Sequence, residues 1–205
     1  MTITKKQIKA IEKFAKEHMD ELTWWHTQQV RDLAAVLAKK EGADAGIVEV
    51  AALLHDIGKS KSKNSRFMHH IKGTVIAKNL LNKNNFDSEA AKEILNCIMR
   101  HLGPYNGFLK AKLKKAGISL SSCPRPDTIE AKCVYDADMI NYCGPFGIAK
   151  TFWLDSHKGT AFRETARYMK MQSRDAYDGL YTKSGKKIAR AYRGISKKFF
   201  EIIGA

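Results

Sequence analysis

Apolar residues recur at intervals of three and four positions along most of the chain, which is the spacing of one face of an α-helix. No segment shows the strict alternation of apolar and polar residues that a half-buried strand needs, so we predict no sheet. Glycine and proline interrupt the pattern between 103 and 128, where we expect a loop around one short helix near 108–116. The sequence therefore predicts an all-α protein, with helices at 5–19, 22–40, 43–57, 70–82, 87–102, 127–142, 145–156, 160–170 and 185–203.

The size and composition are those of a globular domain. The chain has 205 residues, of which 44% are hydrophobic and 28% charged, and we expect a single domain over 1–205. No apolar run approaches the roughly 18 residues of a membrane span, and the N-terminus lacks the apolar stretch of a secretory signal. We therefore expect a cytoplasmic protein that does not bind a membrane, with its four cysteines reduced.

The chain is strongly basic. Lys and Arg outnumber Asp and Glu by 36 to 21, which gives a net charge of +15 at pH 7. A positive field of this size attracts phosphorylated metabolites and nucleic acid. A lysine-rich surface that only keeps the protein soluble accounts for the charge equally well, so the charge alone does not choose between these interpretations.

Three of the seven histidines lie on the apolar faces of different predicted helices: His26, His55 and His101. Asp56 follows His55 directly. A single inward histidine is usually a hydrogen-bonded residue of the core. Three imidazoles and a carboxylate that converge from separate helices need a shared partner, and a metal ion supplies one.

Two acidic residues near the end of the 127–142 helix are further candidates for such a site. Asp136 and Asp138 are two positions apart, so on a helix they point about 200° away from each other. At most one of them is expected to face a shared site. The alternative is that neither is a ligand, with one acid solvated and the other in a cap or an ion pair.

The string AALLHDIGK at 51–59 closely resembles the signature of the HD-domain metal-dependent phosphohydrolases. The segment WWHTQQVRDLAAVLAKKEGAD resembles the first-histidine helix of that superfamily, and its His26 lies 29 residues before His55, a typical distance. The segment VYDADMI resembles the closing motif, in which the final Asp completes the metal site. The resemblance covers roughly 22–142, and the tail LYTKSGKKIARAYRGISKKFF is similar to the end of small stand-alone bacterial members.

Two more histidines match the HDIG-type members of the superfamily. The segment FMHHIKGTVIAKNLL resembles their H-x-x-x-G segment, which aligns His69 rather than His70, because Gly73 follows His69 by four positions. The segment ILNCIMRHLG places His101 where these members carry another ligand. Such members bind two metal ions. The site therefore holds two ions if His69 and His101 bind the second one, and one ion if they do not.

The resemblance implies a single HD-type helical bundle, with a core at about 22–142 and the helices at about 145–203 packed on it. It also implies a phosphohydrolase that attacks a phosphoester or phosphoanhydride of a nucleotide, or of another small phosphorylated metabolite, with metal-activated water. Phosphatase, phosphodiesterase and pyrophosphatase activity all fit, and the oligomeric state is left open. The implied metal ligands are His26, His55, Asp56 and Asp138, with His69 and His101 for a second ion.

The ligand types suit Mn, Fe, Co, Ni, Zn or Mg. Asp56, Lys59, His69 and His101 are the candidate catalytic residues. Lys59 is placed to hold a phosphate or the departing oxygen, and without a second ion the two histidines would act as acids for the leaving group. Weaker candidates for binding phosphate are Arg66 and Arg100, and Arg125, between two prolines, is a candidate for lining the mouth of the site. The alternative function is a basic module that binds nucleic acid or a signalling nucleotide with little turnover.

Overall fold

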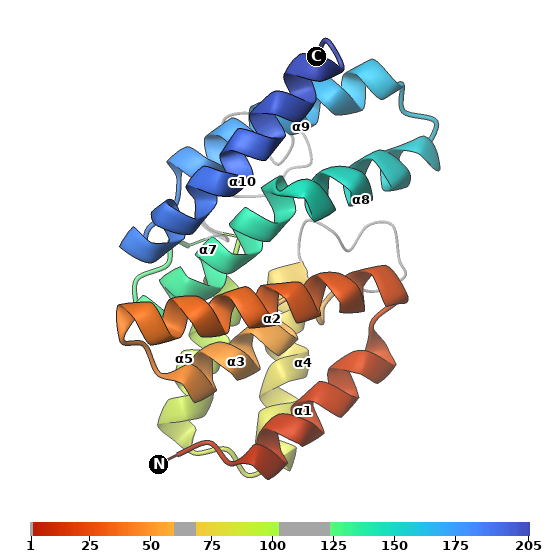
Figure 1. The fold of residues 1–205 in the computed structure, drawn as a ribbon. Coiled ribbons are helices and arrows are strands. Elements are labelled where there is room, and N and C mark those ends of the chain that lie inside the picture. Colours follow the sequence, from red (N-terminus) through yellow and green to blue (C-terminus); the bar gives the residue numbers. More distant parts are fainter. Residues whose placement is uncertain (1, 60–68, 103–123) are drawn as a thin grey trace. The chain divides into compact units, whose positions relative to one another are not determined.

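The computed structural model describes residues 2–59, 69–102 and 124–205, and every regular element in these ranges is an α-helix (Figure 1). The all-α prediction is therefore confirmed, whereas the short helix expected near 108–116 lies outside the described residues. The helices are α1 (Lys5–His18), α2 (Glu21–Glu41), α3 (Ala45–Leu54), α4 (His69–Lys83), α5 (Ser88–Arg100), α7 (Ile129–Cys143), α8 (Pro145–Ser156), α9 (Phe162–Asp178) and α10 (Lys183–Ile202).

The predicted bounds agree with the structure to within a few residues, except at α9. This helix was expected to end near residue 170, but it continues to Asp178 and is followed by Gly179. Gln172 and Ser173 interrupt the apolar stripe in the sequence, yet both are buried in the structure. Because polar side chains occupy the inward face there, periodicity alone gives the helix a false end.

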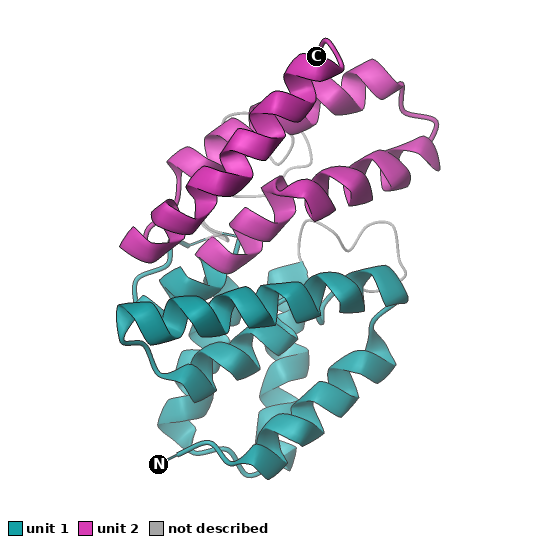
Figure 2. Cartoon of the chain, viewed as in Figure 1, with its two compact units in different colours: residues 1–135 teal, residues 136–205 magenta. Residues whose placement is uncertain are grey.

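The chain divides into two compact units, residues 1–135 and 136–205, and α7 contributes to both (Figure 2). In the first unit α3 packs against α1, α2 and α5, and α4 packs against α5. Val50 to Leu54 are all completely buried, as expected for a helix that is apolar on every side. That the whole chain forms one domain stays a prediction.

Side-chain caps set the beginnings of α2 and α3 in the first unit. Asp20 accepts a hydrogen bond from the backbone N–H of Thr23, and Asp44 accepts from those of Gly46 and Ile47. Such caps satisfy backbone donors that have no partner inside the helix. They fix where α2 and α3 begin. His26 lies on α2, and His55 directly follows α3.

In the second unit α8, α9 and α10 pack on one another. Ile148, Met169 and Phe200 form their shared apolar core. The carbonyl oxygen of Cys143, at the end of α7, accepts hydrogen bonds from the hydroxyls of Tyr177 and Ser196. Among the described residues, no helix combines the length and the apolar character that crossing a bilayer requires.

Gly194 offers a simple test of the α10 assignment. It lies in the interior of the helix, and a Cβ built on it has no atom within 4 Å. Replacing Gly194 with alanine is expected to raise the free energy of unfolding by roughly 0.5–1 kcal/mol, because alanine restricts the unfolded chain and favours the helix. Urea denaturation followed by circular dichroism measures the change, and a loss of stability would contradict an exposed helical position.

Candidate metal centre

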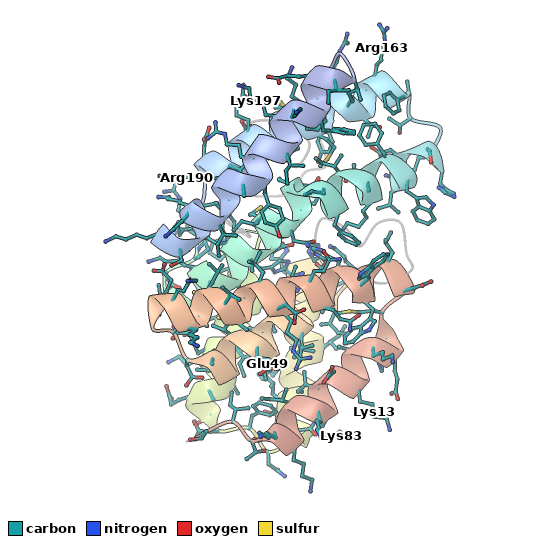
Figure 3. The ribbon with its side chains drawn as sticks, in the orientation of Figure 1. Lys13, Glu49, Lys83, Arg163, Arg190 and Lys197 are labelled. Carbon is teal, nitrogen blue, oxygen red and sulfur yellow. The ribbon has the colours of Figure 1, made fainter. Side chains whose placement is uncertain are left out.

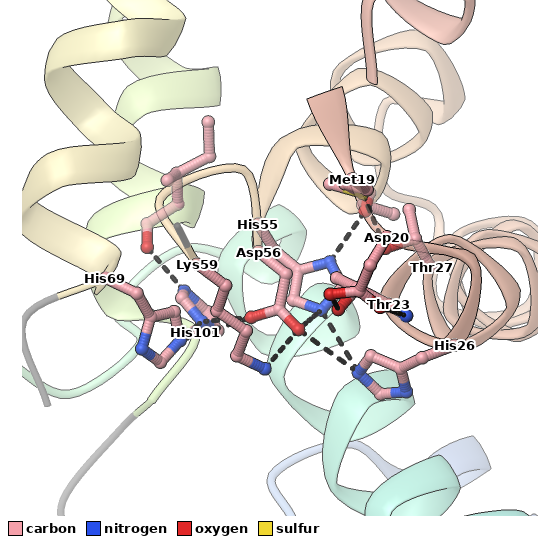
Figure 4. A network of polar contacts seen from close by, with 12 residues as sticks. Met19, Asp20, Thr23, His26, Thr27, His55, Asp56, Lys59, His69 and His101 are labelled. Atoms are coloured by element: carbon pink, nitrogen blue, oxygen red, sulfur yellow. Dashed lines mark hydrogen bonds and ion pairs between the residues drawn. The ribbon is translucent and has the colours of Figure 1, made fainter. Parts of the chain in front are cut away.

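Five side chains converge inside the first unit: His26, His55, Asp56, His69 and His101 (Figure 4). They come from separate elements, since His26 lies on α2, His55 ends α3, His69 begins α4 and His101 ends α5. None is more than 4% exposed. The structure thus brings together five of the six metal ligands that the sequence predicts.

The cluster consists of two groups of three that share one carboxylate. Oδ2 of Asp56 lies 3.6 Å from Nε2 of His26 and 3.4 Å from Nε2 of His55. Its other oxygen, Oδ1, lies 3.2 Å from Nε2 of His69 and 3.8 Å from Nε2 of His101. Within each group the candidate ligand atoms are all within 4.8 Å of one another. Each oxygen of Asp56 therefore serves a different pair of imidazoles.

Hydrogen bonds to the backbone determine which nitrogen of two of these rings faces the cluster. Nδ1 of His55 lies 2.7 Å from the carbonyl oxygen of Ala52, and Nδ1 of His101 lies 2.6 Å from that of Ile98. A carbonyl only accepts hydrogen bonds, so both Nδ1 atoms donate. The neutral rings then present Nε2 lone pairs to the cluster, an arrangement found in metal-binding histidines.

These lone pairs face other acceptors at short range. Nε2 of His55 lies 3.4 Å from Nε2 of His26, and Nε2 of His101 lies 3.0 Å from Nε2 of His69. Lone pairs that point at each other and at a carboxylate are stable only with a positive charge between them, which a divalent cation or an additional proton supplies. The donor set, its burial and its tautomers therefore fit a metal ion.

A close approach between two glycine-containing segments brings the HD turn to the start of α4. A Cβ built on Gly58 would lie 2.0 Å from the carbonyl oxygen of His69 and 2.5 Å from the backbone nitrogen of Gly73. Only glycine fits at position 58, because the obstacle is backbone that cannot rotate away. In the sequence, the position of Gly58 directly after His55-Asp56-Ile57 is the signal for this contact.

Asp56 is ionised despite its complete burial. Burial by itself raises the pKa of a carboxyl group, but the ammonium group of Lys59 holds the pKa of Asp56 well below its usual value. Lys59 pairs directly with Oδ2 of Asp56, and its side chain is 32% exposed. The predicted catalytic lysine thus lies at the edge of the cluster, where it meets solvent.

The other predicted residues are not among the five clustered side chains. Asp138 is buried and belongs to the second unit, so its role as a ligand stays a prediction. Arg66 lies outside the described residues. Arg100 contacts Oδ2 of Asp127 at 3.0 Å and donates to the carbonyl oxygen of the exposed Arg125, so its guanidinium ties α5 to the segment before α7.

Asp136 has a structural role within the second unit. Its carboxylate accepts hydrogen bonds from the backbone N–H of Tyr181 at 2.9 Å, and from the backbone N–H and hydroxyl of Thr182 at 2.7 and 2.6 Å. Thr182 is the N-cap of α10. Burial raises the pKa of Asp136, and the hydrogen bonds from Thr182 and Tyr181 oppose that shift. The carboxylate therefore joins α7 to the beginning of α10.

Replacing Asp136 with asparagine is expected to lower the free energy of unfolding by about 1–3 kcal/mol. An amide has only one oxygen, so its NH₂ group would face a buried N–H donor at either Tyr181 or Thr182. Urea denaturation measures the loss. Asp178→Asn removes an exposed carboxylate and is the matched control, expected to change stability by less than about 0.5 kcal/mol. Equal effects of the two substitutions would contradict the capping role.

A comparison with known protein families identifies the family of this chain. Residues 23–142 match the model of the HD domain. The chain belongs to the HD domain family. The matched range contains all five clustered side chains as well as Asp138, and it nearly coincides with the predicted core at about 22–142. The predicted resemblance is confirmed.

Several individual proteins are similar to this one. The chain is 32% identical over 136 residues to the uncharacterized protein YpgQ of Bacillus subtilis, a match that covers 66% of this chain and 58% of YpgQ. It is 29% identical over 113 residues to a tRNA (cytidine(56)-2'-O)-methyltransferase of Thermoplasma volcanium, covering 55% of this chain and 30% of that protein. The match thus spans less than two thirds of each of these relatives.

Solved structures share the fold over nearly the whole chain. The crystal structure of Bacillus subtilis YpgQ in complex with ADP superposes with a TM-score of 0.72 at 23% identity, covering 97% of this chain and 93% of that one. An HD-superfamily hydrolase from Bacillus thuringiensis gives a TM-score of 0.66 at 22% identity, with coverage of 97% and 93%. At these identities the likeness establishes the all-helical fold.

Proposed function

We propose that this protein is a metal-dependent phosphohydrolase that hydrolyses a phosphoester or phosphoanhydride of a nucleotide or a similar small phosphorylated metabolite. The observation that carries the proposal is the division of the buried cluster into two ligand groups that share Asp56. Paired metal sites of this kind are suited to displacement at phosphorus, where an attacking and a leaving oxygen must both be stabilised.

The proposed metal ligands divide according to the oxygens of Asp56. His26, His55 and Oδ2 would hold one divalent ion, and His69, His101 and Oδ1 a second. Imidazole and carboxylate donors suit Mn, Fe, Co, Ni and Zn, and carboxylates also accept Mg. When bound, such ions supply activated water and polarise the phosphoryl oxygen.

We propose Asp138 as a further ligand. The spacing of Asp136 and Asp138 left open which of them is the ligand. The carboxylate of Asp136 already accepts three hydrogen bonds, which favours Asp138. Asp138 is 7% exposed, and it is the residue that the resemblance to the closing HD motif assigns to the metal. The hypothesis predicts that Asp138→Ala lowers metal content, whereas Asp136→Asn affects stability first.

Lys59 is proposed to bind the phosphate of the substrate. Its ammonium group pairs with Asp56 at the edge of the cluster, and about a third of its side chain meets solvent. A flexible lysine in this position can turn from the carboxylate to a phosphate oxygen, where it acts as a point charge. It would then orient the phosphorus and stabilise the charge on the departing oxygen.

A nucleotide is the proposed substrate class. YpgQ, which is 32% identical to this chain over 136 residues and has the same fold, has been crystallised in complex with ADP, a nucleoside diphosphate. The basic composition of the present chain favours anionic substrates in general. Both observations support a nucleotide over an uncharged metabolite.

The proposal is tested by reconstituting activity. The purified protein is freed of metal with a chelator, loaded separately with Mn, Co, Ni, Zn or Mg, and given nucleoside mono-, di- and triphosphates, a dinucleoside polyphosphate and bis-p-nitrophenyl phosphate. Chromatography of the products distinguishes release of phosphate, pyrophosphate and nucleotide. We expect metal-dependent turnover that is lost in the folded His55→Ala variant. No turnover above that variant with any metal would overturn the proposal.

A further inference from the structure

Two rows of cations run along α9 and α10, helices of the second unit that carry none of the five clustered side chains. Within each helix the members are separated by four, three and four positions, so they share one face of that helix. All eight are exposed. We call this surface the cationic groove. It consists of Arg163, Arg167, Lys170 and Arg174 on α9, and of Lys186, Arg190, Arg193 and Lys197 on α10. Figure 3 labels Arg163, Arg190 and Lys197.

The helices α9 and α10 pack on each other, and two contacts join the rows. Asp178 continues the α9 row by four positions, and its Oδ1 lies 3.2 Å from Nη1 of Arg193 in the α10 row. At the other end, Lys170 of α9 donates to the carbonyl oxygen of Ala205, just beyond α10. Between the helices lies a hollow of about 270 Å³, lined by Tyr177, Asp178, Lys186, Ala189, Arg190 and Arg193.

The charge in this region is one-sided. Residues 162–205 contain eleven Lys and Arg but only four Asp and Glu. Ion pairs neutralise three of the eight cations: Arg174 pairs with Asp175, Arg193 with Asp178 and Lys197 with Glu201. Lys186 and Arg190 face the hollow. An extended surface with this much uncompensated positive charge attracts polyanions.

We propose that the cationic groove binds the phosphodiester backbone of a nucleic acid. The row from Lys186 to Lys197 covers eleven helical steps, or about 16 Å, so it offers charge along a line rather than at a single point. Five of the eight cations are arginines, whose planar fork matches two phosphate oxygens. A linear array of forked donors suits a chain of phosphates.

A membrane surface fits this face less well. A helix that lies on a bilayer inserts its apolar side between the lipids. In α10 that side is buried in the protein, with Ala189 at 3% and Phe200 at 2% exposure. The exposed Ile195 and Ile202 lie about 160–180° around the helix from Lys186, on the side opposite the groove. The cations and the free apolar residues therefore do not form one surface.

Nucleic-acid binding at the groove goes beyond the proposed hydrolase function and does not depend on it. The test compares the full chain with two variants that each lose three positive charges. The groove variant is Lys186→Gln/Arg190→Gln/Lys197→Gln, which retains Arg193 and its ion pair. The matched control is Lys9→Gln/Lys13→Gln/Lys83→Gln, which changes exposed lysines of α1 and α4.

Binding of fluorescein-labelled single-stranded RNA, double-stranded RNA and double-stranded DNA is measured by anisotropy at several salt concentrations, with gels to verify that the probes stay intact. The groove variant is expected to lose about tenfold or more in affinity for the preferred probe. The slope of its log affinity against log salt concentration is expected to become shallower by about 2. The control variant is expected to keep most of the affinity and most of the slope. The three probes show which nucleic acid supplies the backbone.

Three results would overturn the proposal: no probe binds at low salt, the two variants lose affinity equally, or the chain binds phosphatidylserine vesicles but no nucleic acid. Turnover of bis-p-nitrophenyl phosphate by the metal-loaded proteins is measured in parallel. It is expected to be unchanged in the groove variant, so a failure of this proposal is distinguishable from a failure of the hydrolase proposal.

Discussion

Replacing Asp56 with alanine is expected to lower kcat/KM by about 10³-fold or more and to remove metal from both halves of the cluster. Each oxygen of Asp56 faces a different pair of histidines, so this one side chain belongs to both ligand groups. The fold is expected to survive, because the partner Lys59 is 32% exposed and can turn to solvent. Mass spectrometry of bound metal and circular dichroism measure the two effects.

Single histidine variants provide the matched comparison. His26→Ala alters only the first group, and His101→Ala only the second, so under the proposed arrangement each retains about one of the two ions held by the wild type. Asp56→Ala should retain neither. If Asp56→Ala bound as much metal as the histidine variants, the two groups would not share this carboxylate, and the proposed paired site would be wrong.

Replacing Gly58 with alanine is expected to lower the free energy of unfolding by about 3 kcal/mol or more, the largest change in stability that we predict. The added Cβ would lie 2.0 Å from the carbonyl oxygen of His69, so the start of α4 must move. Since His69 lies there, metal affinity should fall as well, by about 10–100-fold. Thermal denaturation and metal titration measure the two changes.

Gly73→Ala is the control for this substitution. A Cβ at Gly73 would lie 3.4 Å from the backbone nitrogen of Gly58 and no closer than that to other atoms, which is ordinary van der Waals contact. Within α4 the alanine also favours the helix, so the net change in stability is expected to stay within about 1 kcal/mol. Similar losses for the two variants would mean that the close approach does not depend on Gly58.

Local signals in the sequence were sufficient for most of the secondary structure and for the identity of the clustered ligands. Periodicity places the described helices, since an amphipathic helix repeats its apolar face every three to four residues. It also places His26, His55 and His101 on apolar faces, while the resemblance to HD-domain proteins added His69. The extent of α9 was missed, because Gln172 and Ser173 are polar residues on its inward face.

What the sequence alone determined, then, is the helical architecture and the kind of side chain available for a metal. Only the tertiary structure decided that the oxygens of Asp56 face two different histidine pairs, that Gly58 permits contact with α4, and that Asp136 caps α10. Helix formation depends on neighbours within a few positions of the chain, and patterns of spacing record it. Apart from the contact between the neighbours His55 and Asp56, these contacts join residues between 11 and 46 positions apart, and their geometry exists only once the helices have packed.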